Sequence, residues 1–402
     1  MPDAGDAEVA VTFVMPCLDE ARSLAHCIGR IREAEAAIQT KYGLRSEILI
    51  ADNGSTDGSQ ALAESLGARV VEVPRKGYGA ALNGGFRAAR GRYLVMGDAD
   101  GSYDFREAAD MVGALVGGAD LCMGSRFKGA ILPGAMPWKN RYIGNPLLTG
   151  ILNLLFRPRV SDAHCGLRAL THDCFERLDL TGSGMEFASE MVIKAALKGE
   201  TIVERPATLS PDLRDRPPHL RPWRDGWRHL RYLFMLSPAW LFALPGAILE
   251  VIGLFILLLS GVHFLVDRKV EFFFGNNWDI LGGALVAVGH IALILALASH
   301  LHGVQQGYRK APPLFVRLAG WLNLETMITG GGALVILGVA DLAAMFTAWN
   351  SKQLTHADSV FPVVLGAVLL SLGAQTILGG FLLAIIGGNE AQFIQAPEQT
   401  EG

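Results

Sequence analysis

Charged residues are scarce after about Arg231, and this scarcity divides the chain into two parts. Of the 402 residues, 50% are hydrophobic and 18% are charged, and the mean hydropathy of +0.31 is high for a wholly soluble protein. Long apolar runs begin where the charges become sparse. The pattern therefore predicts a soluble N-terminal domain followed by a membrane domain.

Three other features are missing. The five cysteines include no CxxC pair, so a zinc or dithiol motif is disfavoured, and reduced thiols in a cytosolic setting are expected. The acidic, polar start MPDAGDAEVA is unlike a secretory signal peptide. No basic patch runs through the soluble part, so we expect no nucleic-acid partner.

The first half alternates apolar runs with helical stretches. Strands are expected at 11–16, at the start of 46–59, at 68–73, before Asp98 and at 119–125, and helices at about 20–39, after Asp57 and within 76–91. This alternation predicts βαβ units and an α/β domain with a mostly parallel sheet. Ligands bind beyond the carboxyl ends of such strands. Three acidic loops, 16–20, 52–57 and 98–104, should therefore meet at one edge.

The stretch MGDADGSYD follows a buried strand and crowds three carboxylates together. Asp98 and Asp100 can both reach one hard cation if the chain turns sharply there. Mg²⁺ is commonly held by one or two carboxylates together with substrate phosphates. Asp104 can equally be a helix N-cap, and so short a motif also recurs by chance in surface turns.

Several motifs occur together in order. They are PCLDE (16–20), ADNGSTDG (51–58), KGYGAALN (76–83), GDADG (97–101), GSRF (124–127), DAHCGLRAL (162–170) and GMEFASE (184–190). With them the chain resembles family 2 glycosyltransferases of the GT-A fold over residues 10–210. More narrowly, it is similar to the polyprenyl-phosphate glycosyltransferases, the dolichyl-phosphate mannose and glucose synthase group.

The resemblance implies roles for matching positions. Asp98 and Asp100 would bind Mg²⁺ or Mn²⁺, and together with Asp162 and Arg126 they would form the catalytic group. The residues expected at the nucleotide-sugar donor are Pro16, Glu20, Asp52, Lys76, Gly79 and Asp98. Those expected at the acceptor phosphate are Arg126, Arg141, Arg168, Arg214 and Arg216. Ser102 stands where the family often carries Gln or Asp, and the family's R-x-G-x-S-K segment is not evident.

A phosphate acceptor would need no strong catalytic base, because a phosphomonoester is already anionic at neutral pH. The site would instead hold two anionic partners together and neutralise them. A single displacement would invert the anomeric carbon. Asp162 can orient the acceptor, act as a weak base or simply hold a turn, and Lys76 can contact diphosphate or be a solvated loop charge.

Four apolar stretches in the second half are long enough to cross a bilayer core of about 30 Å. They lie at about 238–265, 280–301, 323–348 and 360–387. The basic segment 212–231 and the loop 302–322 carry the positive charges, which places both in the cytoplasm. Ionisable residues within or near the spans are functional candidates: Glu250, His290, Glu325 and Asp341.

These observations predict four parts: a GT-A catalytic domain (1–210), a basic juxtamembrane segment (211–237), an all-α transmembrane domain (238–388) and a polar cytoplasmic tail (389–402). The expected protein is a multi-pass enzyme of the cytoplasmic membrane, and it could form a homo-oligomer. It would transfer a sugar from a UDP- or GDP-sugar to undecaprenyl or dolichyl phosphate. Two alternatives stay open: a processive polysaccharide synthase, although its Q-x-x-R-W segment is not found, and a lipid-binding or lipid-translocating protein with a degenerate catalytic domain.

Overall fold

The chain forms two compact units, Met1–Leu233 and Phe234–Gly402. The computed structural model describes residues 9–214, 222–266, 275–309, 317, 321–351, 359–389 and 391–393. All five cysteines are free and buried in the first unit. The finer division into four parts, with a separate segment at 211–237, stays a prediction.

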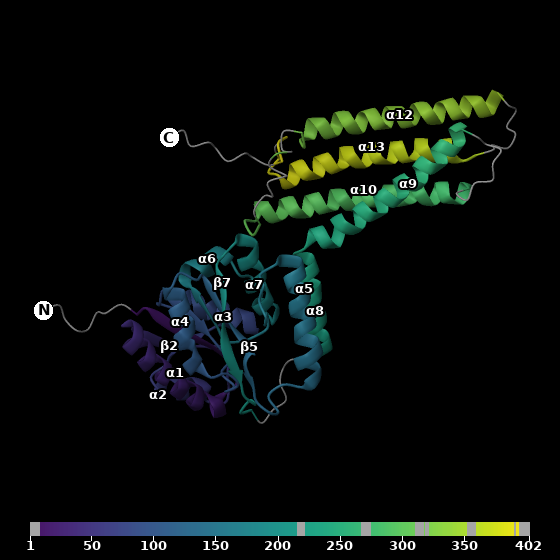
Figure 1. The fold of residues 1–402 in the computed structure, drawn as a ribbon. Helices are drawn as coiled ribbons and strands as arrows, with labels where there is room; N and C mark the ends of the chain where they lie inside the picture. The colour runs from purple at the N-terminus through teal and green to yellow at the C-terminus, as the bar shows by residue number, and fades with distance from the viewer. Residues whose placement is uncertain are drawn as a thin grey trace. The chain divides into compact units, whose positions relative to one another are not determined.

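The first unit is built on a seven-stranded sheet of order β3-β2-β1-β4-β6-β5-β7 (Figure 1). The strands are β1 (Val11–Cys17), β2 (Ser46–Asp52), β3 (Arg69–Glu72), β4 (Tyr93–Met96), β5 (Leu121–Ile131), β6 (Arg168–Thr171) and β7 (Ile202–Leu209). Only β6 runs antiparallel, to both β4 and β5. The α/β fold with a mostly parallel sheet is confirmed, and β6 and β7 are strands that the sequence did not predict.

Helices lie on both faces of this sheet. The helices before the first span are α1 (Ala21–Tyr42), α2 (Ser59–Ser65), α3 (Tyr78–Ala88), α4 (Ala108–Val116), α5 (Asn145–Phe156), α6 (His172–Leu178), α7 (Glu186–Lys198) and α8 (Pro222–Met235), with short turns Phe105–Glu107 and Asn140–Gly144. Successive strand residues point to opposite faces. Phe13 of β1 therefore joins the core formed with α1 and α4, whereas Val14 faces α3 and lies against Gly85.

The strand register brings the acidic loops together. Cys17 at the end of β1 pairs with Asp52 at the end of β2, and Val14 pairs with Met96 at the end of β4. All three strands are parallel, so the loops that follow them leave from the same edge of the sheet. The edge predicted to carry the site is thus formed by β1, β2 and β4.

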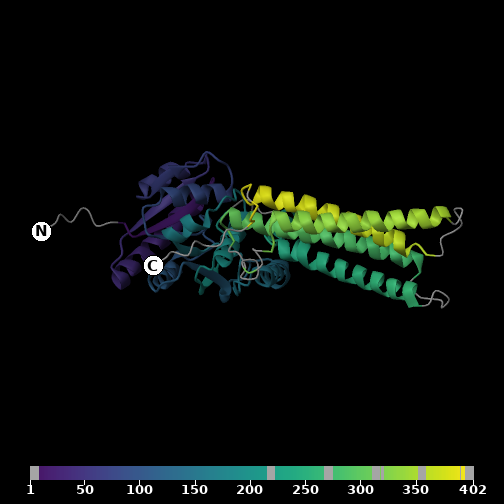
Figure 2. The same ribbon diagram turned by 90° about the horizontal axis from the view of Figure 1, so that it is seen from above.

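The second unit contains four helices that are long and apolar enough to cross a membrane. They are α9 (Leu244–Val266), which continues the turn Ala239–Ala243, α10 (Asn276–Gln305), α12 (Leu324–Ser351) and α13 (Phe361–Ile386). Helix α9 packs on α10, α10 on α13, and α13 on α12 (Figures 1 and 2). The four predicted spans are confirmed, and the chain is an integral membrane protein.

Small residues and a series of three polar side chains connect these helices. A Cβ added to Gly253 would lie 2.6 Å from the carbonyl oxygen of Gly282, so glycine lets α9 and α10 approach closely. Between α9, α10 and α13, Glu250 Oε1 lies 3.5 Å from His290 Nδ1, and His290 Nε2 lies 2.9 Å from Thr376 Oγ1. Polar side chains of α9, α10 and α13 are therefore linked within the spans.

Candidate active site

Two of the acidic loops are tied to each other by their own carboxylates. Asp19 Oδ1 accepts a hydrogen bond from the backbone N–H of Thr56 (2.7 Å), and Asp57 Oδ2 accepts one from Ala21 (2.9 Å). Asp19 takes a positive φ of 57°, which aspartate tolerates better than most residues. The loop with Pro16 and Glu20 is thereby fixed beside the loop with Asp52.

Asp52 is buried, and its carboxylate holds its own loop. The Oδ2 atom accepts hydrogen bonds from the backbone N–H of Gly54 (2.8 Å) and from the Gln60 side chain (2.6 Å). Burial opposes ionisation, but the hydrogen bonds from Ser55 and Gln60 lower the pKa of Asp52. An ionised acceptor thus stands at the end of β2, and its contact with a donor nucleoside stays a prediction.

The Asp98–Asp100 turn lies at the end of β4, deep in the edge. The Tyr78 hydroxyl bonds to the Asp98 carboxyl, and a Cβ on Gly166 would lie 2.7 Å from Asp98 Oδ2, so glycine is required there. Asp100 Oδ1 accepts a hydrogen bond from the Ser102 N–H (2.9 Å). Burial, and next the charge of Asp100, raises the pKa of Asp98 to about 6.

This donor set suits a hard divalent cation. Two carboxylates one residue apart supply oxygen ligands, and a cationic group already lies against Asp100, where Arg214 Nη2 is 3.2 Å from Oδ2. Among the residues that the structure describes, no three Asp, Glu, His or Cys side chains form a metal cluster. Asp98 and Asp100 would hold Mg²⁺ or Mn²⁺ together with substrate phosphates, which is the usual arrangement for Mg²⁺.

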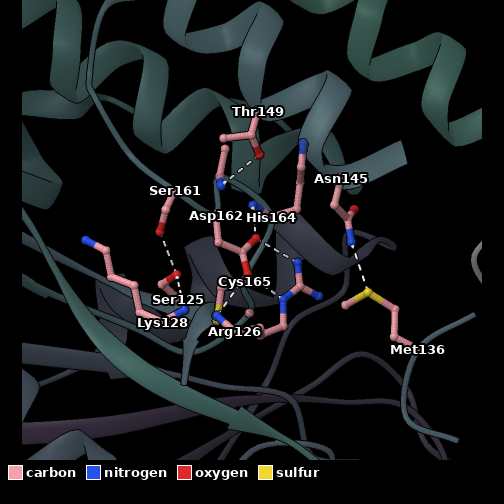
Figure 3. Close-up of polar contacts among 12 residues, drawn as sticks. Ser125, Arg126, Lys128, Met136, Asn145, Thr149, Ser161, Asp162, His164 and Cys165 are labelled. Carbon is pink, nitrogen blue, oxygen red and sulfur yellow. Dashed lines mark hydrogen bonds and ion pairs between the residues drawn. The ribbon is translucent and has the colours of Figure 1, made fainter. Parts of the chain in front are cut away.

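Arg126 and Asp162 form a bidentate ion pair (Figure 3). Arg126 Nε donates to Asp162 Oδ2 (2.6 Å) and Nη2 donates to Oδ1 (2.8 Å), while the Arg126 backbone N–H also bonds to Oδ2 (3.1 Å). Burial opposes ionisation of Asp162, but the bonds from Arg126 lower its pKa. Asp162 is thus a committed partner of Arg126 and a poor base.

Glu204 on β7 positions this pair, and the sequence did not predict it. Its Oε1 accepts hydrogen bonds from the backbone N–H groups of Ser161 (2.7 Å) and Asp162 (3.2 Å). Its Oε2 pairs with Lys128 Nζ at 2.6 Å. No local pattern signals this role, because Glu204 lies about forty residues from the turn that it holds.

Lys76 and Gly79 lie at the start of α3. Lys76 Nζ donates to the carbonyl oxygen of Asn53 at 2.5 Å, so it links two loops of the edge. A Cβ on Gly79 would clash with the Gly182 carbonyl oxygen. Glu190, which is fully buried, accepts the Gly182 N–H (2.7 Å) and thereby fixes this contact. Donor binding by Lys76 and Gly79 stays a prediction.

The arginines expected at the acceptor phosphate lie in different places. Arg168 is fully buried, and its guanidinium donates to backbone carbonyls of Ala163, Cys165 and Ala188. Arg141 lies over the ring of Tyr142 in the turn before α5. Arg214 pairs with acidic side chains of the edge, and Arg216 lies outside the described residues. Phosphate contacts by these arginines stay predictions.

Comparisons with known proteins match two families to parts of this chain. The family described as "Glycosyl transferase family 2" matches residues 12–179, and "Glycosyltransferase family 2 C-terminal transmembrane region" matches residues 297–387. The low-salt glycan biosynthesis hexosyltransferase Agl6 of Haloferax volcanii is 36% identical over 96% of this chain and 91% of its own length.

Two further similarities cover about half of this chain. The polyprenol monophosphomannose synthase of Mycolicibacterium smegmatis is 28% identical over 49% of this chain and 76% of its own. The crystal structure of glucosyl-3-phosphoglycerate synthase from Mycobacterium tuberculosis with Mn²⁺, UDP and glucosyl-3-phosphoglycerate covers 57% of this chain and 78% of that chain, with 21% identity and a TM-score of 0.41. From the match to Agl6 along nearly the whole length of both chains, together with the two matching families, the chain belongs to glycosyltransferase family 2 and is a membrane glycosyltransferase.

Proposed function

We propose that this glycosyltransferase moves a sugar from a UDP- or GDP-sugar to a polyprenyl phosphate, with inversion and with the help of Mg²⁺ or Mn²⁺. The observation that carries the proposal is the Asp98–Asp100 turn at the end of β4, together with the buried Arg126–Asp162 pair. Burial raises the pKa of the Tyr103 hydroxyl group, and so does the charge of Asp98, whereas Arg126 lowers it, so Tyr103 lies near both groups. The similarity to a polyprenol monophosphomannose synthase supports the acceptor.

The reaction would be one displacement. An oxygen of the acceptor phosphate attacks the anomeric carbon, and the bond from that carbon to the donor diphosphate breaks with both electrons on the leaving nucleoside diphosphate. The attacking oxygen is already anionic, so no base has to remove a proton. A divalent cation, when bound, supplies positive charge to the departing diphosphate.

The side chains of the chain prepare this step. A guanidinium has five N–H donors, and the side-chain bonds to Asp162 use two of them. The planar fork of Arg126, held rigidly by Asp162, can direct its other donors at a phosphate. Asp162 fixes the orientation of Arg126 and takes no proton, in keeping with its lowered pKa.

The charges of the membrane half indicate the leaflet at which the acceptor would bind. Positive charges lie before the first span and between the second and third, at Arg309 and Arg317 among others. The positive-inside rule then supports a catalytic unit at the cytoplasmic leaflet. A polyprenyl phosphate has its headgroup at this level, so the enzyme would meet its acceptor at the surface of its own membrane.

The experiment that tests the proposal offers the purified protein a panel of UDP- and GDP-sugars with undecaprenyl or dolichyl phosphate, and reads product mass. One sugar added to one polyprenyl phosphate is the expected product, and the anomeric configuration by NMR tests inversion. A polymer would show a processive synthase instead. Equal transfer to free polyprenol, or no transfer with any pair, would reject the proposal.

A further inference from the structure

The residues that follow β7 lie on the Asp98–Asp100 turn. The backbone N–H of Ser210 bonds to the Ser102 carbonyl (2.8 Å), and that of Leu213 bonds to the Asp100 carbonyl (2.9 Å). Gly101 has a φ of 79°, and a Cβ there would lie 2.8 Å from the Leu213 side chain. Segment 210–214 is therefore docked on the turn that would hold the cation.

Arg214 ends this docked segment and joins two of the acidic loops. Its Nε lies 2.9 Å from Glu20 Oε1, and its Nη2 lies 3.2 Å from Asp100 Oδ2. The Arg214 side chain is only 17% exposed, and that of Glu20 is 6% exposed. A single, largely buried cation thus offsets part of the negative charge of Glu20, Asp98 and Asp100.

A divalent cation and Arg214 compete for the same carboxylate. Asp100 uses Oδ1 for the Ser102 N–H and Oδ2 for Arg214. A metal ion on Oδ2 would displace the guanidinium, because two positive charges at contact distance repel strongly where little water screens them. The docked segment would lose its charged contact at the same moment.

We propose that Arg214 is an exchangeable counter-ion: it holds Asp100 and Glu20 until the metal and the donor bind, and is then released for the acceptor phosphate. This inference rests on the proposed function. It adds an order to the reaction, since the arginine becomes available only after the donor site is filled. The donor and the metal therefore bind before Arg214 binds the lipid phosphate.

The exchange predicts that removing an arginine tightens metal binding. Mn²⁺ binding to the full-length protein, with UDP and with GDP, is followed by the loss of the free Mn²⁺ signal in electron paramagnetic resonance. Arg214→Gln should bind Mn²⁺–nucleotide about tenfold more tightly than wild type, equivalent to about 1.4 kcal/mol, while transferring sugar more slowly. A residue that only supports the fold would not tighten binding.

Arg177→Gln is the matched control. Arg177 also engages two carboxylates of the first unit, Asp120 and Glu200, but lies on the surface. This variant should keep the wild-type affinity for Mn²⁺ and the wild-type rate of transfer. Affinity that is unchanged or weaker in Arg214→Gln would overturn the exchange alone, whereas wild-type protein that binds Mn²⁺ with neither nucleotide would overturn the proposed function as well.

A second measurement needs no variant. Trypsin must take the arginine side chain into its own pocket, so cleavage after Arg214 requires the guanidinium to leave Glu20 and Asp100. Mn²⁺ with the bound nucleotide should speed cleavage after Arg214 at least tenfold, while cleavage after the exposed Arg90 keeps its rate. Equal or slower cleavage after Arg214 would show that the arginine stays in place and would refute the release.

Discussion

The Asp162→Asn substitution tests whether the buried ion pair holds the acceptor side of the site together. Asp162 is wholly buried, and it accepts three hydrogen bonds from Arg126 and one from the His164 N–H. Asparagine keeps one carbonyl oxygen but leaves the Arg126 charge without a counter-charge. Removing one partner of a buried pair costs about 3–5 kcal/mol, and we expect the lower end, about 3 kcal/mol, for Asn.

This cost converts into a melting temperature. For a unit of 150–250 residues, each kcal/mol shifts Tm by about 2–4 °C, so Asp162→Asn should lower it by about 6–12 °C. A thiol-reactive dye reports the unfolding of this unit selectively, because all five cysteines are buried within it. The pKa of Asp162 is lowered in the fold, so its stabilisation is fully present above the ordinary carboxyl pKa and the assay belongs near pH 7.

Asp173→Asn is the control, because Asp173 is an exposed carboxylate in the first turn of α6. It should change Tm by less than about 2 °C, in line with a surface substitution of about 0.5 kcal/mol. If Asp162→Asn also melted within about 2 °C of wild type yet lost all transfer, the pair would not be structural. Asp162 would then act directly on a reacting group.

Three further outcomes are expected. EDTA should abolish transfer, and Mg²⁺ or Mn²⁺ should restore it. Asp100→Asn should lower the rate of transfer at least about a hundredfold even with metal, since the leaving diphosphate loses its counter-charge. Full activity in EDTA would refute the metal site. Burial and the neighbouring His229 lower the pKa of His164 to about 3, so His164 takes up a proton on unfolding at any pH below its ordinary pKa of about 6.5. Between pH 7.5 and pH 5 this group should therefore lower the free energy of unfolding by about 2 kcal/mol. His164→Asn should remove this part of the dependence of the melting temperature on pH. Thr376→Val should remove the hydrogen-bond partner of His290 and destabilise the membrane half by about 1 kcal/mol, measured by unfolding in SDS. The control Thr347→Val alters a hydroxyl that bonds to Ala344 of its own helix, and it should leave the stability unchanged.

The fold could be predicted where local pattern decides it. Short apolar runs, each followed by a loop rich in Asp, Gly and Ser, identified β1, β2 and β4 and placed Asp52 and Asp98 at one edge, because the ends of parallel strands meet there. The four spans were equally readable from their length and apolar content. Strand β6 was not, since four residues paired antiparallel between β4 and β5 leave no distinctive run.

The partners of the site residues could not be read from the sequence. Asp162 was open to three readings there, and only the contact with Arg126, 36 positions away, distinguishes a committed ion-pair partner from a base. Glu204 carries no motif because its role depends on the pairing of β7 with β5. Such contacts are set by topology, which local spacing does not encode.

Arg214 shows how topology changes the chemistry assigned to a residue. From the sequence it is one arginine of a basic segment near the membrane, and a phosphate contact is its natural assignment. In the fold, the course of the chain after β7 carries it back onto the Asp98–Asp100 turn, where it pairs with Asp100 and Glu20. A cluster of buried carboxylates needs a cation at every stage of the reaction. An arginine that supplies this charge before the metal arrives, and an anionic acceptor that receives it afterwards, keep a cation beside Asp100 at each stage and leave the arginine paired.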